Sequence, residues 1–129
     1  SFLACRLGNQ ACLHAYRTLY FNMNRFTEQL SLAKLQGTYI KWLNQLKKAD
    51  LIILDDFGLQ QLDQNAKLAL LQMLEDRYDY KSTIIVSQLP IEHWHSFINE
   101  PTIADAILDR ILAKCFNFDL KGKSLRIKI

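Results

Sequence analysis

The segment that most constrains the fold is a run of four aliphatic residues that ends in two adjacent carboxylates, Leu51 to Gly58 (Leu-Ile-Ile-Leu-Asp-Asp-Phe-Gly). A continuous apolar run is typical of a strand that is buried on both faces, and such strands usually belong to parallel sheets. Functional groups of open α/β sheets gather beyond the carboxyl ends of the strands. The run therefore predicts a central strand that delivers Asp55 and Asp56 to one edge of the sheet.

Two adjacent carboxylates at the end of such a strand suit a site that hydrolyses a nucleotide. Asp55 would hold the hydrated Mg²⁺ that bridges two phosphates, and Asp56 would orient or deprotonate the attacking water. A core strand followed by an Asp-Asp-x-Gly turn explains the same residues, because Asp and Gly are common in turns. The run alone leaves both interpretations open.

Composition indicates one globular domain. The chain has 129 residues, half of them hydrophobic, and its net charge of +3 permits a nucleic-acid partner without demanding one. No apolar stretch approaches the roughly 20 residues that span a membrane, so we expect no membrane partner. Cys5, Cys12 and Cys115 lack metal-ligand spacing, which favours reduced, buried thiols in a cytoplasmic protein.

Helix and strand patterns alternate along the whole chain, which predicts a single α/β domain over residues 1–129. A hairpin signal at the carboxyl end could close one edge of the sheet. The expected strands are Arg17–Met23, Leu51–Leu54, Ser82–Val86 and the hairpin pair Cys115–Leu120 and Ser124–Ile129, joined through Lys121-Gly122-Lys123. The expected helices are Phe2–Tyr16, a long helix from an Asn24 cap to Lys48 interrupted near Gly37, Asp63–Tyr78, Ile91–Phe97 and Ile103–Ala113.

Polar residues also end the next buried strand, at Ser87 and Gln88. A nucleotide hydrolase needs a polar side chain on a neighbouring strand that senses the γ-phosphate or positions the water, although Gln88 could equally be a strand-end cap. Arg110 stands in an otherwise apolar helix and could reach a γ-phosphate as an arginine finger, commonly supplied by a neighbouring subunit. The alternative for Arg110 is a surface charge without a role.

Three ordered motifs together resemble one family: Leu-Asp-Asp-Phe-Gly, then Ser-Thr-Ile-Ile-Val-Ser-Gln-Leu-Pro-Ile-Glu-His-Trp-His, then Ala-Asp-Ala-Ile-Leu-Asp-Arg-Ile-Leu. They resemble the IstB-like ATPases, helper proteins of insertion-sequence transposition and AAA+ relatives of the DnaC helicase loader and the DnaA initiator. The resemblance covers nearly the whole chain. It implies a three-layer P-loop NTPase fold, with a parallel sheet flanked by helices.

The resemblance also implies roles for single residues. Asp55 and Asp56 would form the Walker B motif, Gln88 with Ser87 would occupy sensor 1, and Arg110 would lie in the arginine-bearing segment after sensor 1. Many AAA+ proteins have Glu at the second acidic position and Asn at sensor 1. Asp56 and Gln88 depart from that pattern, which affects the expected rate of hydrolysis more than the existence of the site.

The sequence contains no Gly-x-x-x-x-Gly-Lys-[Ser/Thr] loop, which would supply the backbone N–H groups and the lysine that hold phosphates. In the family this loop precedes a helix like Phe2–Tyr16, so Ser1 resembles its last residue and would be a second Mg²⁺ ligand beside Asp55. Alternatively Ser1 is only a terminal residue. We therefore expect a partial AAA+ domain that lacks the P-loop and the first, central strand. It would be inactive alone, leave strand edges open to dimerisation or aggregation, and come from a parent ATPase.

Three functional hypotheses follow. The first is an ATP- and Mg²⁺-dependent helper of transposition that assembles as a homo-oligomer on DNA and acts on a transposase. Clustered lysines would contact the DNA backbone unless they are only a solvated helix face. These candidates are Lys34, Lys41, Lys47 and Lys48.

The second hypothesis is a DnaC-like loader of a replicative helicase, or a non-hydrolysing adaptor that binds its partner through an exposed apolar face. Trp94 between His93 and His95 is the candidate contact, although this pattern is more typical of a helix packed by its tryptophan. The two histidines point to different helix faces, which argues against a shared metal. A metal-dependent nuclease is a third hypothesis, but the helix carrying Glu75, Asp76 and Asp79 is expected to face away from the strand ends.

Overall fold

The computed structural model describes residues 2–14, 16–113, 115–120 and 123–128, with the side chains of residues 4–14, 16–113 and 115. Its sheet contains three parallel strands, β1 (Thr18–Asn22), β2 (Leu51–Asp55) and β3 (Ser82–Ser87), with β2 paired to both others. The two remaining strands, β4 (Cys115–Leu120) and β5 (Lys123–Lys128), form the predicted hairpin. The strand order is β1-β2-β3-β5-β4.

The hairpin covers the outer edge of β3. We expected strand edges to be left open without a further central strand, but β5 pairs antiparallel with β3 from Thr83–Lys128 to Ser87–Ser124. The predicted turn at Lys121 and Gly122 lies outside the described residues. Because an unpaired edge strand invites association with other chains, this pairing removes one of the places where aggregation was expected.

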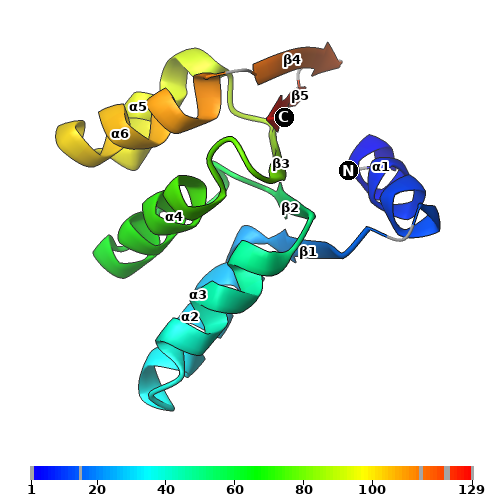
Figure 1. Ribbon diagram of the computed structural model, residues 1–129. Helices are drawn as coiled ribbons and strands as arrows, with labels where there is room; N and C mark the ends of the chain where they lie inside the picture. The colour runs from blue at the N-terminus through cyan, green and yellow to red at the C-terminus, as the bar shows by residue number, and fades with distance from the viewer. Residues whose placement is uncertain (1, 15, 114, 121–122, 129) are drawn as a thin grey trace.

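Helices cover the two faces of the sheet unequally (Figure 1). Helix α1 (Phe2–Leu13) packs alone on one face, against the side chains of Leu51 and Ile53 from β2 and Ile84 and Val86 from β3. The opposite face carries the larger core. It lies under α2 (Met23–Leu35), α3 (Tyr39–Lys48), α4 (Gln64–Arg77), the 3₁₀ turn η1 (Ile91–His93), α5 (Trp94–Ile98) and α6 (Pro101–Leu112).

The aliphatic residues of β2 pack against the helices on both faces of the sheet. Ile53 faces α1, whereas Ile52 and Leu54 enter the large core, and each of these three side chains is at most 1 % exposed. Successive residues of a strand point to opposite faces, so a strand between two helical layers must be apolar at every position. The predicted α/β fold, a parallel sheet flanked by helices, is confirmed.

Two predicted helix signals are confirmed and one is wrong. The Asp63 carboxylate caps α4 by accepting a hydrogen bond of 2.8 Å from the Ala66 amide. Gly37, with φ of +70°, separates α2 from α3. Asn22, and not Asn24, caps α2 through a 2.8 Å hydrogen bond from Arg25 N. Strand β1 runs directly into the helix, so its last residue performs the capping.

The predicted burial of the cysteines is wrong for two of the three. Cys5 and Cys12 are exposed, and Cys115 is half-buried; all three are free thiols. Ala4, Leu7 and Ala11 turn the other side of α1 towards the sheet. Since one helix face is occupied by these residues, Cys5 and Cys12 are left on the solvent side.

Trp94 lies inside the protein, as the helix-packing interpretation predicts. Its side chain is 0 % exposed, its ring centroid is 4.8 Å from that of Phe57, and its Nε1 donates a 2.8 Å hydrogen bond to the Leu89 carbonyl. Trp94 is therefore unavailable as an exposed contact for a partner protein. Among the described residues, no helix is long and apolar enough to cross a membrane.

Candidate functional site

The two aspartates that follow the aliphatic run occupy different environments. Asp55 is the last residue of β2 and only 6 % exposed, whereas Asp56 is exposed and has a positive φ of +60°. A left-handed conformation is uncommon for residues other than Gly, and Asp tolerates it better than most. This backbone turn separates the two carboxylates, so that they can serve different purposes.

Asp55 is held by hydrogen bonds to both of its carboxylate oxygens. The Tyr20 hydroxyl on β1 donates to Oδ2 at 2.5 Å, and the Asp56 amide donates to Oδ1 at 2.9 Å. Burial acts to raise the pKa of Asp55, but the hydrogen bonds that it accepts, these two among them, hold that pKa below its ordinary value. Burial and the neighbouring carboxylate raise the pKa of Tyr20. Asp55 is thus ionised, and its carboxylate is held in one orientation.

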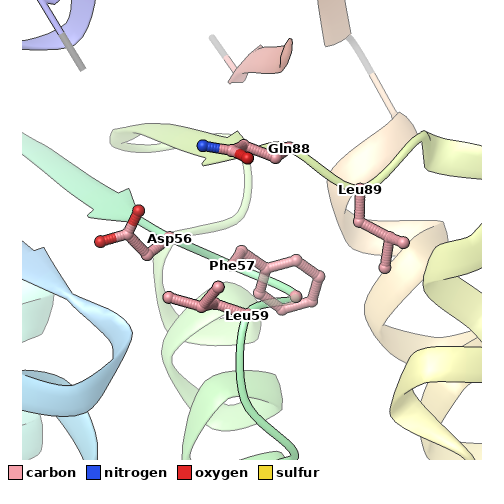
Figure 2. A pocket seen from close by; sticks show the side chains of 6 residues that line it. Asp56, Phe57, Leu59, Gln88 and Leu89 are labelled. Carbon is pink, nitrogen blue, oxygen red and sulfur yellow. The ribbon is translucent and has the colours of Figure 1, made fainter. Parts of the chain in front are cut away.

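A small pocket lies beyond the ends of β2 and β3. Its volume is about 270 Å³, and it lies between the loop after Asp55 and the loop after Ser87. Figure 2 shows the Asp56 carboxylate and the Gln88 amide on the same side of this pocket, with Phe57, Leu59 and Leu89 forming its apolar part. The structure therefore brings Asp56 and Gln88 together, as expected for the ends of adjacent parallel strands.

Ser87 fixes the two loops to each other. It is 1 % exposed, donates a hydrogen bond to the Phe57 carbonyl, and accepts one of 3.0 Å from the Leu89 amide. Phe57 N also donates to the Val86 carbonyl at 3.0 Å. Ser87 therefore supports the wall that carries Gln88 and does not itself line the pocket.

Gly58 permits the close approach of these loops. Its φ is +93°, and a Cβ at this position would lie 3.0 Å from Leu89 Cβ and 3.2 Å from Ser87 Oγ. A residue with a side chain would meet both a strained backbone conformation and a steric clash. Gly58 is thus required by the pocket wall, which explains the glycine in the Asp-Asp-x-Gly pattern.

Arg110 lies away from this pocket. Its guanidinium contacts Asp109 Oδ2 at 2.8 Å and Glu75 Oε1 at 3.3 Å, and lies 6.0 Å from the centroid of the Tyr78 ring. Glu75 belongs to α4, so the arginine joins α6 to α4 on the surface of one chain. Within one molecule, Arg110 is not among the residues that line the pocket of Asp56 and Gln88.

Asp55 is suited to be a protein ligand of a magnesium ion. Mg²⁺ usually keeps several waters and takes one or two carboxylates together with substrate phosphates. No group of three or more metal-ligating side chains occurs among the described residues, so a site there would rest on Asp55 and non-protein ligands. Ser1, predicted as the second ligand, lies outside the described part of the chain.

The sequence did not reveal Tyr20 as a partner of Asp55. Alternation along β1 places Tyr20 and Asn22 on one face, but the partner depends on the register, which pairs Asn22 with Asp55 and Tyr20 with Ile53. The available signal was a tyrosine two residues before the end of a neighbouring strand. It could be assigned to Asp55 only once the register of β1 against β2 was known.

Comparison with solved structures defines the class of fold. The chain is similar to the replication initiator DnaA bound to AMPPCP and single-stranded DNA, with a TM-score of 0.66 and 19% identity over 77% of this chain and 31% of that one. AMPPCP-bound DnaA from Aquifex aeolicus gives a TM-score of 0.66 and 18% identity over 79% of this chain and 32% of that one. The likeness shows that the chain shares the α/β fold of these DnaA structures.

Sequence comparison identifies the family. The family model described as IstB-like ATP binding protein matches residues 1–129, and the chain belongs to this family. It is 47% identical over 126 residues to the insertion sequence ATP-binding protein y4pL of Sinorhizobium fredii, covering 98% of this chain and 51% of that protein. It is 46% identical over 90 residues to the insertion sequence IS1162 ATP-binding protein of Pseudomonas fluorescens, covering 70% of this chain and 39% of that protein. The chain thus spans about half the length of y4pL.

Proposed function

We propose that this chain supplies the acidic and polar side of an ATP-hydrolysing site in a helper protein of insertion-sequence transposition. The observation that supports the proposal most is an ionised, doubly hydrogen-bonded Asp55 at the carboxyl end of the central parallel strand, beside a pocket shared by Asp56 and Gln88. Family membership and the nucleotide-bound state of the similar DnaA structures agree with it.

Each residue of this site has a separate role. Asp55 would be the Walker B ligand of Mg²⁺, which when bound neutralises charge between two phosphates. Asp56, exposed at the pocket, would orient or deprotonate the attacking water. Gln88 would position that water or contact the γ-phosphate from the loop after β3, and Ser87 would hold that loop in place.

Arg110 would act on the nucleotide of a neighbouring subunit. Within one chain Arg110 pairs with Glu75 and Asp109 and does not line the pocket, but its partial exposure on α6 suits a contact made in an assembly. An arginine supplied from outside the site stabilises charge in the transition state of phosphoryl transfer. Hydrolysis would then require a homo-oligomer.

DNA is the partner on which we propose that the oligomer assembles, and a transposase is the protein on which it acts. The predicted lysine contacts all lie exposed on the α2–α3 pair, which projects from the sheet in Figure 1. Loading of a replicative helicase is the alternative protein partner. The lysines that support DNA contact are Lys34, Lys41, Lys47 and Lys48.

A chimera tests this function. Residues 1–129 replace the matching segment of the Sinorhizobium fredii relative, and ATP binding and Mg²⁺-dependent turnover are measured with and without DNA. We expect Asp56→Asn to abolish turnover while ATP still binds, and Asp55→Asn to remove the dependence on Mg²⁺. Asp105→Asn, an exposed change on α6, is the matched control and should leave both unchanged.

Two results would contradict the proposal. Normal turnover in the Asp56→Asn chimera would show that this carboxylate does not serve the reaction. A chimera that binds ATP but is inert with DNA, while the unaltered relative is active, would favour a non-hydrolysing adaptor in place of an ATPase.

A further inference from the structure

The buried tryptophan of α5 contacts both loops that form the pocket of Asp56 and Gln88. Trp94 is the first residue of α5, and its side chain is 0% exposed. Its ring packs against the ring of Phe57, which follows Asp56 in the chain. Its Nε1 donates a hydrogen bond to the carbonyl of Leu89, which follows Gln88. One side chain therefore contacts the residue after each of the two polar residues of the pocket.

Both polar atoms of the Leu89 backbone are bonded to side chains. Its N–H donates a 3.0 Å hydrogen bond to Ser87 Oγ, and its carbonyl accepts the 2.8 Å hydrogen bond from Trp94 Nε1. Gln88 lies between this residue and Ser87, which is only 1% exposed. The backbone on either side of Gln88 is thus fixed, so the Gln88 amide extends into the pocket from a defined point.

The backbone of Phe57 is fixed in a similar way. Its N–H donates to the Val86 carbonyl at 3.0 Å, and its carbonyl accepts a hydrogen bond from the Ser87 hydroxyl. Its ring centroid lies 4.8 Å from that of Trp94 and 5.3 Å from that of Phe97, with interplanar angles of 57° and 72°. Because buried aromatic rings pack in preferred tilted or edge-to-face arrangements, Trp94 helps to determine where the residue after Asp56 lies.

Trp94 is itself held by the helices α5 and α6. Phe97 and Ile98 of α5 are buried. The Glu100 carboxylate caps α6 by accepting a 3.0 Å hydrogen bond from the Ile103 amide, which fixes the connection between the two helices. Side chains packed at interior density have little freedom to shift. Trp94 therefore gives the two pocket loops a common support that neither loop provides for itself.

We propose that Trp94 is a positioning residue for hydrolysis, because it sets the separation between the Asp56 carboxylate and the Gln88 amide through Phe57 and Leu89. This inference rests on the proposed ATPase function. Asp56 and Gln88 would act on the same water, and a misplacement of about 1 Å in such an arrangement can cost a hundredfold in rate. Trp94 lies outside the pocket lining, so it acts only through these neighbours.

Trp42→Phe is the matched control for Trp94→Phe. The chain has two tryptophans, both are buried, and each donates a hydrogen bond through Nε1, in the case of Trp42 to Gln29 Oε1 at 3.2 Å. Each substitution keeps an aromatic ring and removes one donor. Trp42 lies on α3 and does not line the pocket, so only Trp94→Phe should affect the two loops.

Amide hydrogen exchange of the 129-residue chain tests the support of the loops without any nucleotide. Trp94→Phe should accelerate exchange of the Phe57 and Leu89 amides about tenfold relative to Trp42→Phe, because both loops open locally more often. The Ala66 amide, which is bonded to the Asp63 cap of α4, is the internal reference and should not change. Equal acceleration of all three amides would overturn the proposal, because it would indicate only a general loss of stability.

A benzothienyl alanine at position 94 isolates the hydrogen bond. This analogue keeps the shape of tryptophan but has sulfur in place of the indole N–H, so it should fold even if Trp94→Phe does not. It should accelerate exchange of the Leu89 amide, while the Ala66 amide stays unchanged. An unchanged Leu89 amide would show that the bond from Trp94 Nε1 does not hold this loop, and would overturn the proposal.

Turnover of the chimera tests the effect on the reaction. Trp94→Phe should lower kcat about tenfold or more and change KM for ATP less than about twofold, because misplacing the water affects the reaction step. Trp42→Phe should leave both values unchanged. In a Gln88→Ala background, Trp94→Phe should lower kcat little further, since no separation is left to maintain.

Two kinetic results would overturn the proposal. One is a rise in KM for ATP with an unchanged kcat in Trp94→Phe, which would assign Trp94 to the binding of ATP. The other is an equal loss of kcat from Trp94→Phe with and without Gln88, which would show that the effect does not pass through that residue. Because exchange is measured without nucleotide, an unaltered chimera that is inert would count against the proposed ATPase only.

Discussion

Nη1 of Arg77 donates a 2.6 Å hydrogen bond to the carbonyl oxygen of Ala49, which ties the end of α4 to the segment that enters β2. The same nitrogen donates to Leu46 O at 2.7 Å, while Nη2 donates to Ser82 O at 2.5 Å and Nε to Thr83 Oγ1 at 3.2 Å. Burial lowers the pKa of Arg77 to about 10, which leaves it charged at neutral pH. One side chain therefore joins α4 to the end of α3, to the segment before β2 and to the start of β3.

Replacing Arg77 should destabilise the fold more than any exposed substitution. In Arg77→Met, the apolar volume is largely kept but the donors to three backbone carbonyls are lost, and we expect a loss of about 3–5 kcal/mol in the free energy of unfolding. Urea denaturation measures this quantity. Arg25→Met, on the exposed side of α2, is the control and should change it by less than about 0.5 kcal/mol. Similar values for both variants would show that the buried hydrogen bonds do not stabilise the protein.

The glycines Gly58 and Gly37 allow a matched comparison. Both have positive φ, but an added Cβ meets Leu89 and Ser87 at Gly58 and nothing within 4 Å at Gly37. Gly37→Ala should cost about 1 kcal/mol from the backbone conformation alone. Gly58→Ala should cost about 1–2 kcal/mol more, because the two loops must also separate. Thermal or urea unfolding gives both values, and equal costs would contradict the close contact of the loops.

The pH dependence of stability should reflect Asp50. Its Oδ1 accepts a 2.9 Å hydrogen bond from Lys81 Nζ and its Oδ2 one of 2.9 Å from the Arg17 amide, and these contacts lower its pKa from 3.8. A carboxyl whose pKa is lowered by folding stabilises the protein above 3.8, and this contribution is lost as the pH falls below that value and through the folded pKa.

Asp50→Asn checks this sign. The variant should be less stable than the unaltered chain at pH 7, and the difference should shrink as the pH falls below 3.8 in urea unfolding. Glu28→Gln, an exposed change on α2, serves as control. A difference between Asp50→Asn and the unaltered chain that stays constant from neutral to acidic pH would contradict the assignment.

Substitutions of Arg110 and Glu75 distinguish a structural role of Arg110 from a catalytic one. Their ion pair is partly exposed, so Arg110→Ala and Glu75→Gln should each cost less than about 1 kcal/mol of stability. If Arg110 serves a neighbouring nucleotide, Arg110→Ala should lower turnover of the assembled chimera about a thousandfold, while Glu75→Gln should leave it intact. Equal turnover losses would assign the effect to the ion pair within one chain.

Asp56 and Gln88 should depend on each other. Asp56 is one methylene shorter than the Glu common at this position in AAA+ proteins, and Gln88 is one methylene longer than the Asn common at sensor 1. Both side chains line one pocket. In the chimera, Asp56→Glu and Gln88→Asn should each reduce turnover by about a hundredfold through misplacement of the water, and the double variant should recover most of it. If the turnover losses of the two single variants simply add in the double variant, the side-chain lengths at positions 56 and 88 do not compensate for each other.

Several elements followed from local sequence alone. The aliphatic run defined β2 because a strand between two helical layers must be apolar at every position. Asp63 and Gly37 marked helix ends because capping and positive φ are properties of single residues. The placement of Asp56 and Gln88 at one pocket followed from the shared direction of parallel strands.

Contacts between distant residues were decided by the tertiary structure. The partner of Tyr20 depends on the register of β1 against β2, and the burial of Arg77 depends on where α3 ends relative to α4. The side of α1 that faces solvent, and with it Cys5, was settled by how that helix packs on the sheet. The sequence by itself determined the elements and the acids at the strand end, because these arise from local periodicity. Only the packed sheet and helices decided which side chains meet, because register and docking are set by interactions over the whole chain.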